Sequence, residues 1–242
     1  MQRREFLFVV GGTLLSRSLR AQQASEEEPR ITAPLVETPE ALERIAHLRK
    51  RLQAAELDAS AVLKDPAQLD LHELTAFREL VRDHAPSQRL TMVTPEEPGT
   101  PLVAVGELRD ATGAPAKDAL VYVYQTSTKG WYSERAPHLS GDGGDQGHAR
   151  LFGYVVADER GRFEVRTIRP AGYPGTDLPA HIHVQVFRDE RRLLVSEFLF
   201  EDDPRLTPAQ RDSSRQAGFP ICPVTKDADG VQHVAASFTL RG

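Results

Sequence analysis

Cysteine is almost absent from this chain of 242 residues, which contains Cys222 alone. A single thiol excludes an internal disulfide, and it excludes a zinc site built from several cysteines. We expect Cys222 to behave as a small hydrophobic side chain. A chain without disulfides is typical of a protein that folds in a reducing compartment such as the cytoplasm.

An excess of positive charge is also missing, because 30 lysines and arginines oppose 35 acidic residues. Residues 1–22 contribute +3 to the net charge of -5, so the rest of the chain carries -8. Binding to nucleic acid needs a basic face that neutralises phosphates, and this acidic body argues against such a partner. The length fits one main domain with an appendage.

Long hydrophobic runs are missing as well. The apolar stretch at residues 6–15 is shorter than the ~20 residues that span a membrane. The pair Arg3-Arg4 precedes this stretch, and small residues at Ala21 and Ala24 offer a cleavage site after it. This order is typical of a twin-arginine signal. We expect residues 1–24 to engage the twin-arginine export machinery and bring a folded protein to the periplasm or the exterior. The alternative is an incidental arginine pair ahead of a membrane anchor.

Residues 25–95 are expected to be a linker followed by helices. Thr38 and Pro39 are suited to the N-cap and the first turn of a helix, and apolar residues then recur at helical spacing. A second helix is expected at about residues 71–84. The helical pair either covers the core or forms a homodimer contact, and the sequence does not choose between the two.

From Leu102 the apolar period changes to two, which is typical of strands, and we expect a domain at residues 96–242. Short strands separated by turns predict a mainly β domain, an antiparallel β-sandwich core behind the N-terminal helical segment. The long connection at residues 131–150 is glycine-rich, and we expect it over the mouth of a site. The expected strands are residues 102–108, 119–125, 152–157, 163–168, 181–187, 193–200 and 234–240.

Two histidines lie two residues apart inside the run of β-formers at residues 179–186. In a strand, His181, His183 and Gln185 share one face, and this geometry suits one metal ion held by two imidazoles. The alternative is a pair of solvent-facing histidines on an edge strand. The opposite face is apolar and is expected in the core: Ile182, Val184 and Val186.

Two tyrosines lie in turns upstream of this strand. Tyr173 stands in the turn Pro170-Ala171-Gly172-Tyr173-Pro174, and Tyr132 stands in Gly130-Trp131-Tyr132, after a strand that ends in Gln125. Each tyrosine alone is as well explained by a packed turn or by a surface aromatic. Four further histidines are expected on the surface: His47, His72, His84 and His233.

The four residues together resemble the signature of the intradiol ring-cleavage dioxygenases, the catechol and protocatechuate type with non-haem Fe(III). The resemblance covers roughly residues 100–242 and implies the β-sandwich fold. It implies one Fe(III) per chain, held by Tyr132, Tyr173, His181 and His183. A trivalent ion lowers the pKa of a bound phenol, which suits a tyrosinate ligand. Hard phenolate oxygen argues against copper or zinc at the histidine pair.

The resemblance also implies an oxidoreductase that uses O2 on a catecholic substrate in aromatic catabolism. The ring opens between the two hydroxylated carbons and gives a muconate-type diacid. Tyr173 is implied as the catalytic base that takes up a substrate proton. Two loop histidines, His138 and His148, are candidates for contacts behind the ligands or with substrate.

Two positions depart from the family pattern. Leu178 stands where an arginine usually precedes the Pro-Ala-His-Ile-His run, and Glu197 stands where a glutamine is usual. Loss of a cation that stabilises charge on the substrate can cost orders of magnitude in rate. These departures predict a preference for alkyl, chloro or hydroxyl substituents over a carboxylate. They also keep open a non-catalytic metal- or catechol-binding module on the same fold.

Overall fold

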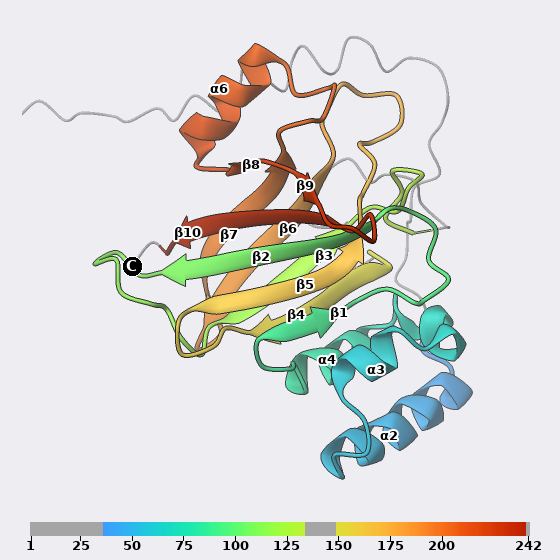
Figure 1. The fold of residues 1–242 in the computed structure, drawn as a ribbon. Helices are drawn as coiled ribbons and strands as arrows, with labels where there is room; N and C mark the ends of the chain where they lie inside the picture. Colours follow the sequence, from blue (N-terminus) through green and yellow to red (C-terminus); the bar gives the residue numbers. More distant parts are fainter. Residues whose placement is uncertain (1–35, 134–148, 241–242) are drawn as a thin grey trace, which may run out of the picture.

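The computed structural model describes residues 36–133 and 149–240 (Figure 1). The expected export signal and the two loop histidines, His138 and His148, lie outside the described residues. In the described part of the chain, no helix combines the length and apolar character needed to cross a membrane.

Two five-stranded sheets form the body of the described chain (Figure 1). The first sheet has the order β1 (Arg89–Thr91), β5 (Arg162–Ile168), β2 (Pro101–Arg109), β10 (Gln232–Thr239), β9 (Thr225–Lys226). The second sheet has the order β4 (Leu151–Val156), β3 (Leu120–Gln125), β6 (His181–Arg188), β7 (Arg191–Phe200), β8 (Ile221–Cys222).

The mainly β sandwich is confirmed, and its sheets are mixed. Each expected strand forms within two residues of its expected ends. Three neighbouring pairs are parallel, however: β1 with β5, β2 with β10, and β7 with β8. Parallel neighbours need a crossover connection, which the sequence pattern alone does not show.

The core lies between the two sheets because alternate residues of each strand point inward. Along β6, Ile182, Val184 and Val186 are fully buried, as expected. Aromatic rings meet across the sandwich. The ring of Phe238 on β10 lies edge-on to Phe198 on β7, with centroids 5.1 Å apart. His181 and His183 therefore lie on the outer face of β6, away from the core between the sheets.

The N-terminal helices cover one end of the sandwich, beside β1 and β4 (Figure 1). The chain runs through α2 (Pro39–Gln53), α3 (Ala59–Leu63), the 3₁₀ helix η1 (Pro66–Leu71) and α4 (Thr75–Asp83). Thr38 caps α2 as expected, since its hydroxyl accepts a hydrogen bond from the backbone N–H of Ala41 at 3.2 Å. The second helix is shorter than expected because η1 ends at Leu71 and a turn follows it, so that α4 begins only at Thr75.

α4 contributes to the core, so at least this helix acts as a cover. Its buried side chains include Phe77, Leu80 and Val81. A homodimer contact through the helices stays a prediction, as does a domain boundary at residue 96. Strand β1 lies before that boundary and already pairs with β5.

Candidate metal centre

β6 supplies two histidines whose rings meet on its outer face. The Nε2 atoms of His181 and His183 lie 3.0 Å apart, and the ring planes are nearly perpendicular, at 87°. Nδ1 of His181 donates to the backbone carbonyl of Pro179 at 2.8 Å. That bond leaves the lone pair of its Nε2 directed at the space shared with His183.

The two tyrosines reach the same point from their turns. Their phenolic oxygens lie 2.5 Å apart. The Tyr132 oxygen is 2.7 Å from Nε2 of His183, and the Tyr173 oxygen is 3.0 Å from Nε2 of His181. Both tyrosines are buried, at 2% and 6% exposure. The structure therefore brings together all four residues that the sequence marks as metal ligands.

Buried polar contacts hold the two tyrosine turns side by side. Gln125 ends β3, where its side chain donates to the carbonyl of Ile168 at 2.8 Å, at the end of β5. Thr126 Oγ1 donates to the carbonyl of Ala171 at 2.6 Å. Gly130 has φ +77°, and a Cβ atom there would lie 2.4 Å from the carbonyl oxygen of Gly172. The Gly-x-Tyr turn thus needs its glycine to approach the Tyr173 turn.

His183 has two further neighbours, Tyr124 and Glu197. Its ring stacks on Tyr124 with centroids 4.3 Å apart and planes at 13°. Its Nδ1 lies 3.4 Å from a carboxylate oxygen of Glu197. Burial, with the neighbouring His181 as a smaller cause, holds the pKa of His183 well below its ordinary value of 6.5. His183 is therefore neutral, the form that binds a metal.

The donor set fits an iron ion. Ligand atoms bound at about 2 Å to one ion lie roughly 3 Å from each other. Five of the six pairs among the four donor atoms lie between 2.5 and 3.4 Å. Imidazole suits iron among several metals, and anionic phenolate oxygen favours a highly charged cation. Glu197 contacts the ring nitrogen of His183 that does not face the phenols, so it is a neighbour of that candidate ligand.

A buried ion pair outside the sequence predictions ties down the chain beside Tyr132. Arg150 binds Glu97 through two contacts of 2.6 and 2.7 Å, and the Glu97 side chain is 5% exposed. The backbone N–H of Arg150 donates to the carbonyl of Tyr132 at 2.7 Å. No spacing in the sequence points to this pair, because its partners are 53 residues apart.

The expectation of a surface position is wrong for His72. This histidine is fully buried, and it stacks on Phe77 with centroids 5.1 Å apart. Its Nδ1 donates to the carbonyl of Arg150 at 2.9 Å. Tertiary packing of the helices against β4 decides its burial, and a lone histidine in a sequence carries no signal of that.

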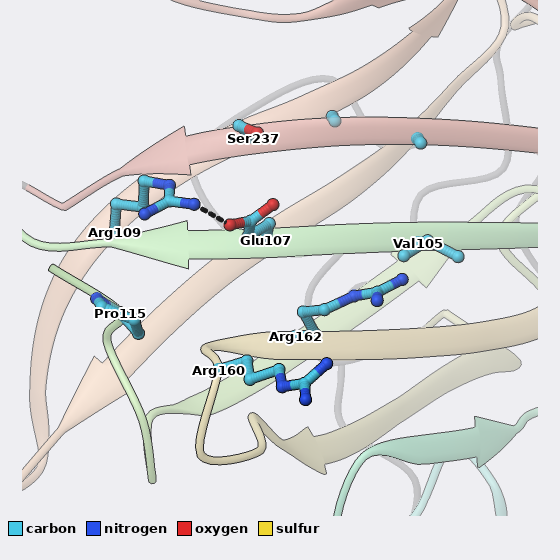
Figure 2. A pocket seen from close by; sticks show the side chains of 9 residues that line it. Val105, Glu107, Arg109, Pro115, Arg160, Arg162 and Ser237 are labelled. Carbon is cyan, nitrogen blue, oxygen red and sulfur yellow. Dashed lines mark hydrogen bonds and ion pairs between the residues drawn. The ribbon is translucent and has the colours of Figure 1, made fainter. Parts of the chain in front are cut away.

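A groove of about 590 Å³ lies on the other sheet, over outward-facing residues of β2, β5 and β10 (Figure 2). Arginines line it, and one of them, Arg109, pairs with Glu107. None of the four candidate ligands lines this groove. The groove is therefore not part of the candidate centre, despite its volume.

Comparisons with known proteins agree with this geometry. Residues 76–241 match the family profile described as Dioxygenase. The chain is 30% identical over 154 residues to catechol 1,2-dioxygenase 1 from Acinetobacter lwoffii, which covers 57% of this chain and 47% of that protein. It is 30% identical over 164 residues to chlorocatechol 1,2-dioxygenase from Rhodococcus opacus, with 60% and 62% covered.

The fold is similar to a solved catechol 1,2-dioxygenase from Pseudomonas arvilla C-1. The TM-score is 0.51 at 18% identity, over 85% of this chain and 78% of that chain. The matches to the two relatives above span only 47% and 62% of those proteins. The family profile nevertheless spans more than half of this chain, and the chain belongs to the intradiol ring-cleavage dioxygenase family.

Proposed function

We propose that this protein is an exported Fe(III) dioxygenase that opens the ring of catecholic compounds with O2. The convergence of Tyr132, Tyr173, His181 and His183 carries the proposal. One Fe(III) per chain would be held by these four side chains. When bound, it would supply the Lewis acid and electron acceptor that make a catecholate reactive towards O2.

The proposed reaction balances without a further oxidant or reductant. Both atoms of O2 enter the product, and the bond between the two hydroxylated carbons breaks to give a diacid. Tyr173 is the proposed catalytic base, because its phenolic oxygen lies among both histidines and Tyr132. As an anion, that oxygen can take the proton of a substrate hydroxyl. The buried surroundings would keep bulk water from competing for the proton.

Two residues support a proposed substrate class, Leu178 close to the candidate ligands in sequence and Glu197 close to them in space. Leu178 lies three residues before His181 and is 39% exposed, so it offers an apolar surface close to the ligand strand. Glu197 adds a negative charge behind His183. An apolar wall and a nearby carboxylate both favour uncharged catechols over carboxylated ones.

Export by the twin-arginine route is part of the proposal and is supported by Arg3-Arg4 and the following apolar stretch.

The test combines metal analysis, visible absorption and oxygen uptake. The wild-type protein should contain one iron per chain, absorb in the visible through tyrosinate-to-iron charge transfer, and consume O2 with catechol. Tyr173→Phe and His183→Ala should both lose iron, visible colour and activity. Tyr154→Phe is the matched control, because that tyrosine stacks on Tyr122 outside the ligand set.

Full iron and colour in both ligand variants would overturn the metal site. Iron without oxygen uptake on any catechol would favour the non-catalytic module.

A further inference from the structure

The carboxylate behind His183 has no role in the four-ligand set. We propose that Glu197 is a positioning residue that accepts the Nδ1 proton of His183, and so fixes the tautomer that turns the Nε2 lone pair towards the two phenols. The inference rests on the proposed function for its metal, while the contact itself is a property of the protein alone.

The strand register places the two side chains opposite each other. His183 on β6 faces Glu197 on β7, and cross-strand partners point to the same face of a sheet. The closest approach is 3.4 Å, between Nδ1 and a carboxylate oxygen, with side-chain exposures of 17% and 20%. This distance is longer than an ordinary hydrogen bond, and such contacts at reactive sites often tighten once the ligand is bound.

Each group lacks another partner within the described ranges 36–133 and 149–240. There, the carboxylate of Glu197 forms no ion pair with a lysine or an arginine, and Nδ1 of His183 has no other hydrogen-bond acceptor. A carboxylate that is four-fifths buried is costly without a partner. The ring N–H is the partner that the structure offers.

The two histidines need different acceptors because of their places in β6. His181 begins the strand and donates to the backbone carbonyl of Pro179, just outside the ladder. His183 lies further along, where β6 runs between β3 and β7 and its carbonyls face those ladders. A side chain from the neighbouring strand must therefore supply the acceptor. Tyr124 fixes the plane of the ring by stacking, and Glu197 fixes which nitrogen carries the proton.

A carboxylate also changes the charge of the centre. Two tyrosinates and one carboxylate balance the three positive charges of Fe(III). A metal-bound histidine that donates to a carboxylate is a stronger electron donor. Glutamine at position 197 would keep a hydrogen-bond acceptor and remove the charge, whereas alanine would remove both. Comparing Glu197→Gln with Glu197→Ala therefore separates the effect of the hydrogen bond from the effect of the charge.

The first test reads the tautomer in metal-free protein by NMR of the histidine ring nitrogens. Wild type and Glu197→Gln should show His183 protonated at Nδ1, and Glu197→Ala should show a mixture of tautomers. The matched control is Glu164→Gln, which removes a carboxylate of similar exposure, 23%, from β5 on the other sheet. A single unchanged tautomer in Glu197→Ala would overturn the positioning role.

The second test reads the metal. Iron affinity, measured by competition with a chelator, should fall about 10- to 100-fold in Glu197→Ala and stay within about threefold in Glu197→Gln. Glu197→Gln should shift the charge-transfer band to longer wavelength relative to Glu164→Gln. If Glu197→Ala does not fold, the metal-free wild-type protein decides, because a His183 protonated at Nε2 there would overturn the inference. If the wild-type protein binds no iron, the proposed function is wrong. The tautomer measurement would still test whether Glu197 positions His183.

Discussion

His72 shows how burial of one titratable group makes stability depend on pH. Burial is the main cause that lowers the pKa of His72 from 6.5 to about 4, with the positive charges of Arg150 and Arg78 as further contributions. The backbone carbonyl of Arg150 and the charge of Asp70 oppose this shift. The folded protein therefore holds this imidazole neutral at pH values where the unfolded chain would protonate it.

The unfolded state binds the proton more readily between the two pKa values, so stability falls as the pH drops from about 6.5 towards about 4. Between about pH 7.5 and about pH 5, the loss in the free energy of unfolding is about 2 kcal/mol from this group. His72→Asn keeps a donor for the Arg150 carbonyl and removes the titration. Urea unfolding at both pH values should give a flatter pH dependence for the variant. An equal slope in variant and wild type would show that His72 is not the cause.

Leu178 places an apolar side chain where the family pattern has a cation, and this predicts the order of substrates. Catechols with methyl or extra hydroxyl groups should have a higher kcat/KM than protocatechuate, since the side chain of Leu178 offers a carboxylate no positive charge. The measurement compares 4-methylcatechol, hydroxyquinol and protocatechuate under one set of conditions. Leu178→Arg should raise the relative kcat/KM for protocatechuate. Protocatechuate as the best substrate of the unchanged protein would refute the argument.

At the scale of elements, the contact between the two tyrosine turns determines whether the four candidate ligands meet. Gly130 and Gly113 both have positive φ, +77° and +89°, so alanine strains the backbone at each by about 1–2 kcal/mol. Only at Gly130 would the new Cβ atom also collide, with the carbonyl of Gly172, whereas the space at Gly113 is open. Gly130→Ala should separate Tyr132 from Tyr173 and lose iron. Gly113→Ala should keep full iron at a similar cost of strain. Equal iron content in the two variants would contradict this role for Gly130.

The sequence predicted those elements whose apolar residues recur at a regular spacing. Alternation of apolar residues predicted the central strands, and the same alternation put His181 and His183 on one face. Their meeting with Tyr132 and Tyr173 was expected only from the resemblance, since those turns are held by contacts such as Gln125 to Ile168.

Other elements carry no such period. α6 (Pro208–Ala217) has no buried residue, so no apolar spacing marks it, although Thr207 and Gln210 form a capping box at its start. β1 has only three residues and is defined by its pairing with β5. Contacts between distant segments, such as Glu97 with Arg150 and His183 with Glu197, depend on the assembled sandwich.

At the scale of the whole molecule, the candidate centre needs both sheets and the loops between them to be in place. Tyr132 follows β3, Tyr173 follows β5, and the histidines lie on β6, so segments from both sheets contribute. A metal centre of this kind can form only once the chain has folded. This requirement fits an export route that carries folded proteins, because iron could be inserted before transport.

The twin-arginine prediction rests on Arg3-Arg4 and the apolar stretch that follows, and this requirement agrees with it. Lysine at both Arg3 and Arg4 keeps the positive charge but removes the guanidinium pair, and it should leave the precursor inside the cell. The matched control changes Arg17 and Arg20 to lysine, which alters the same number of arginines in the same segment. Cell fractionation with immunoblotting measures both variants, and the control should be exported as the unchanged protein is. Because the twin-arginine route requires a folded cargo, Gly130→Ala should be exported if its sandwich folds, even without iron. Normal export of the Arg3 and Arg4 double variant would show that the pair is incidental.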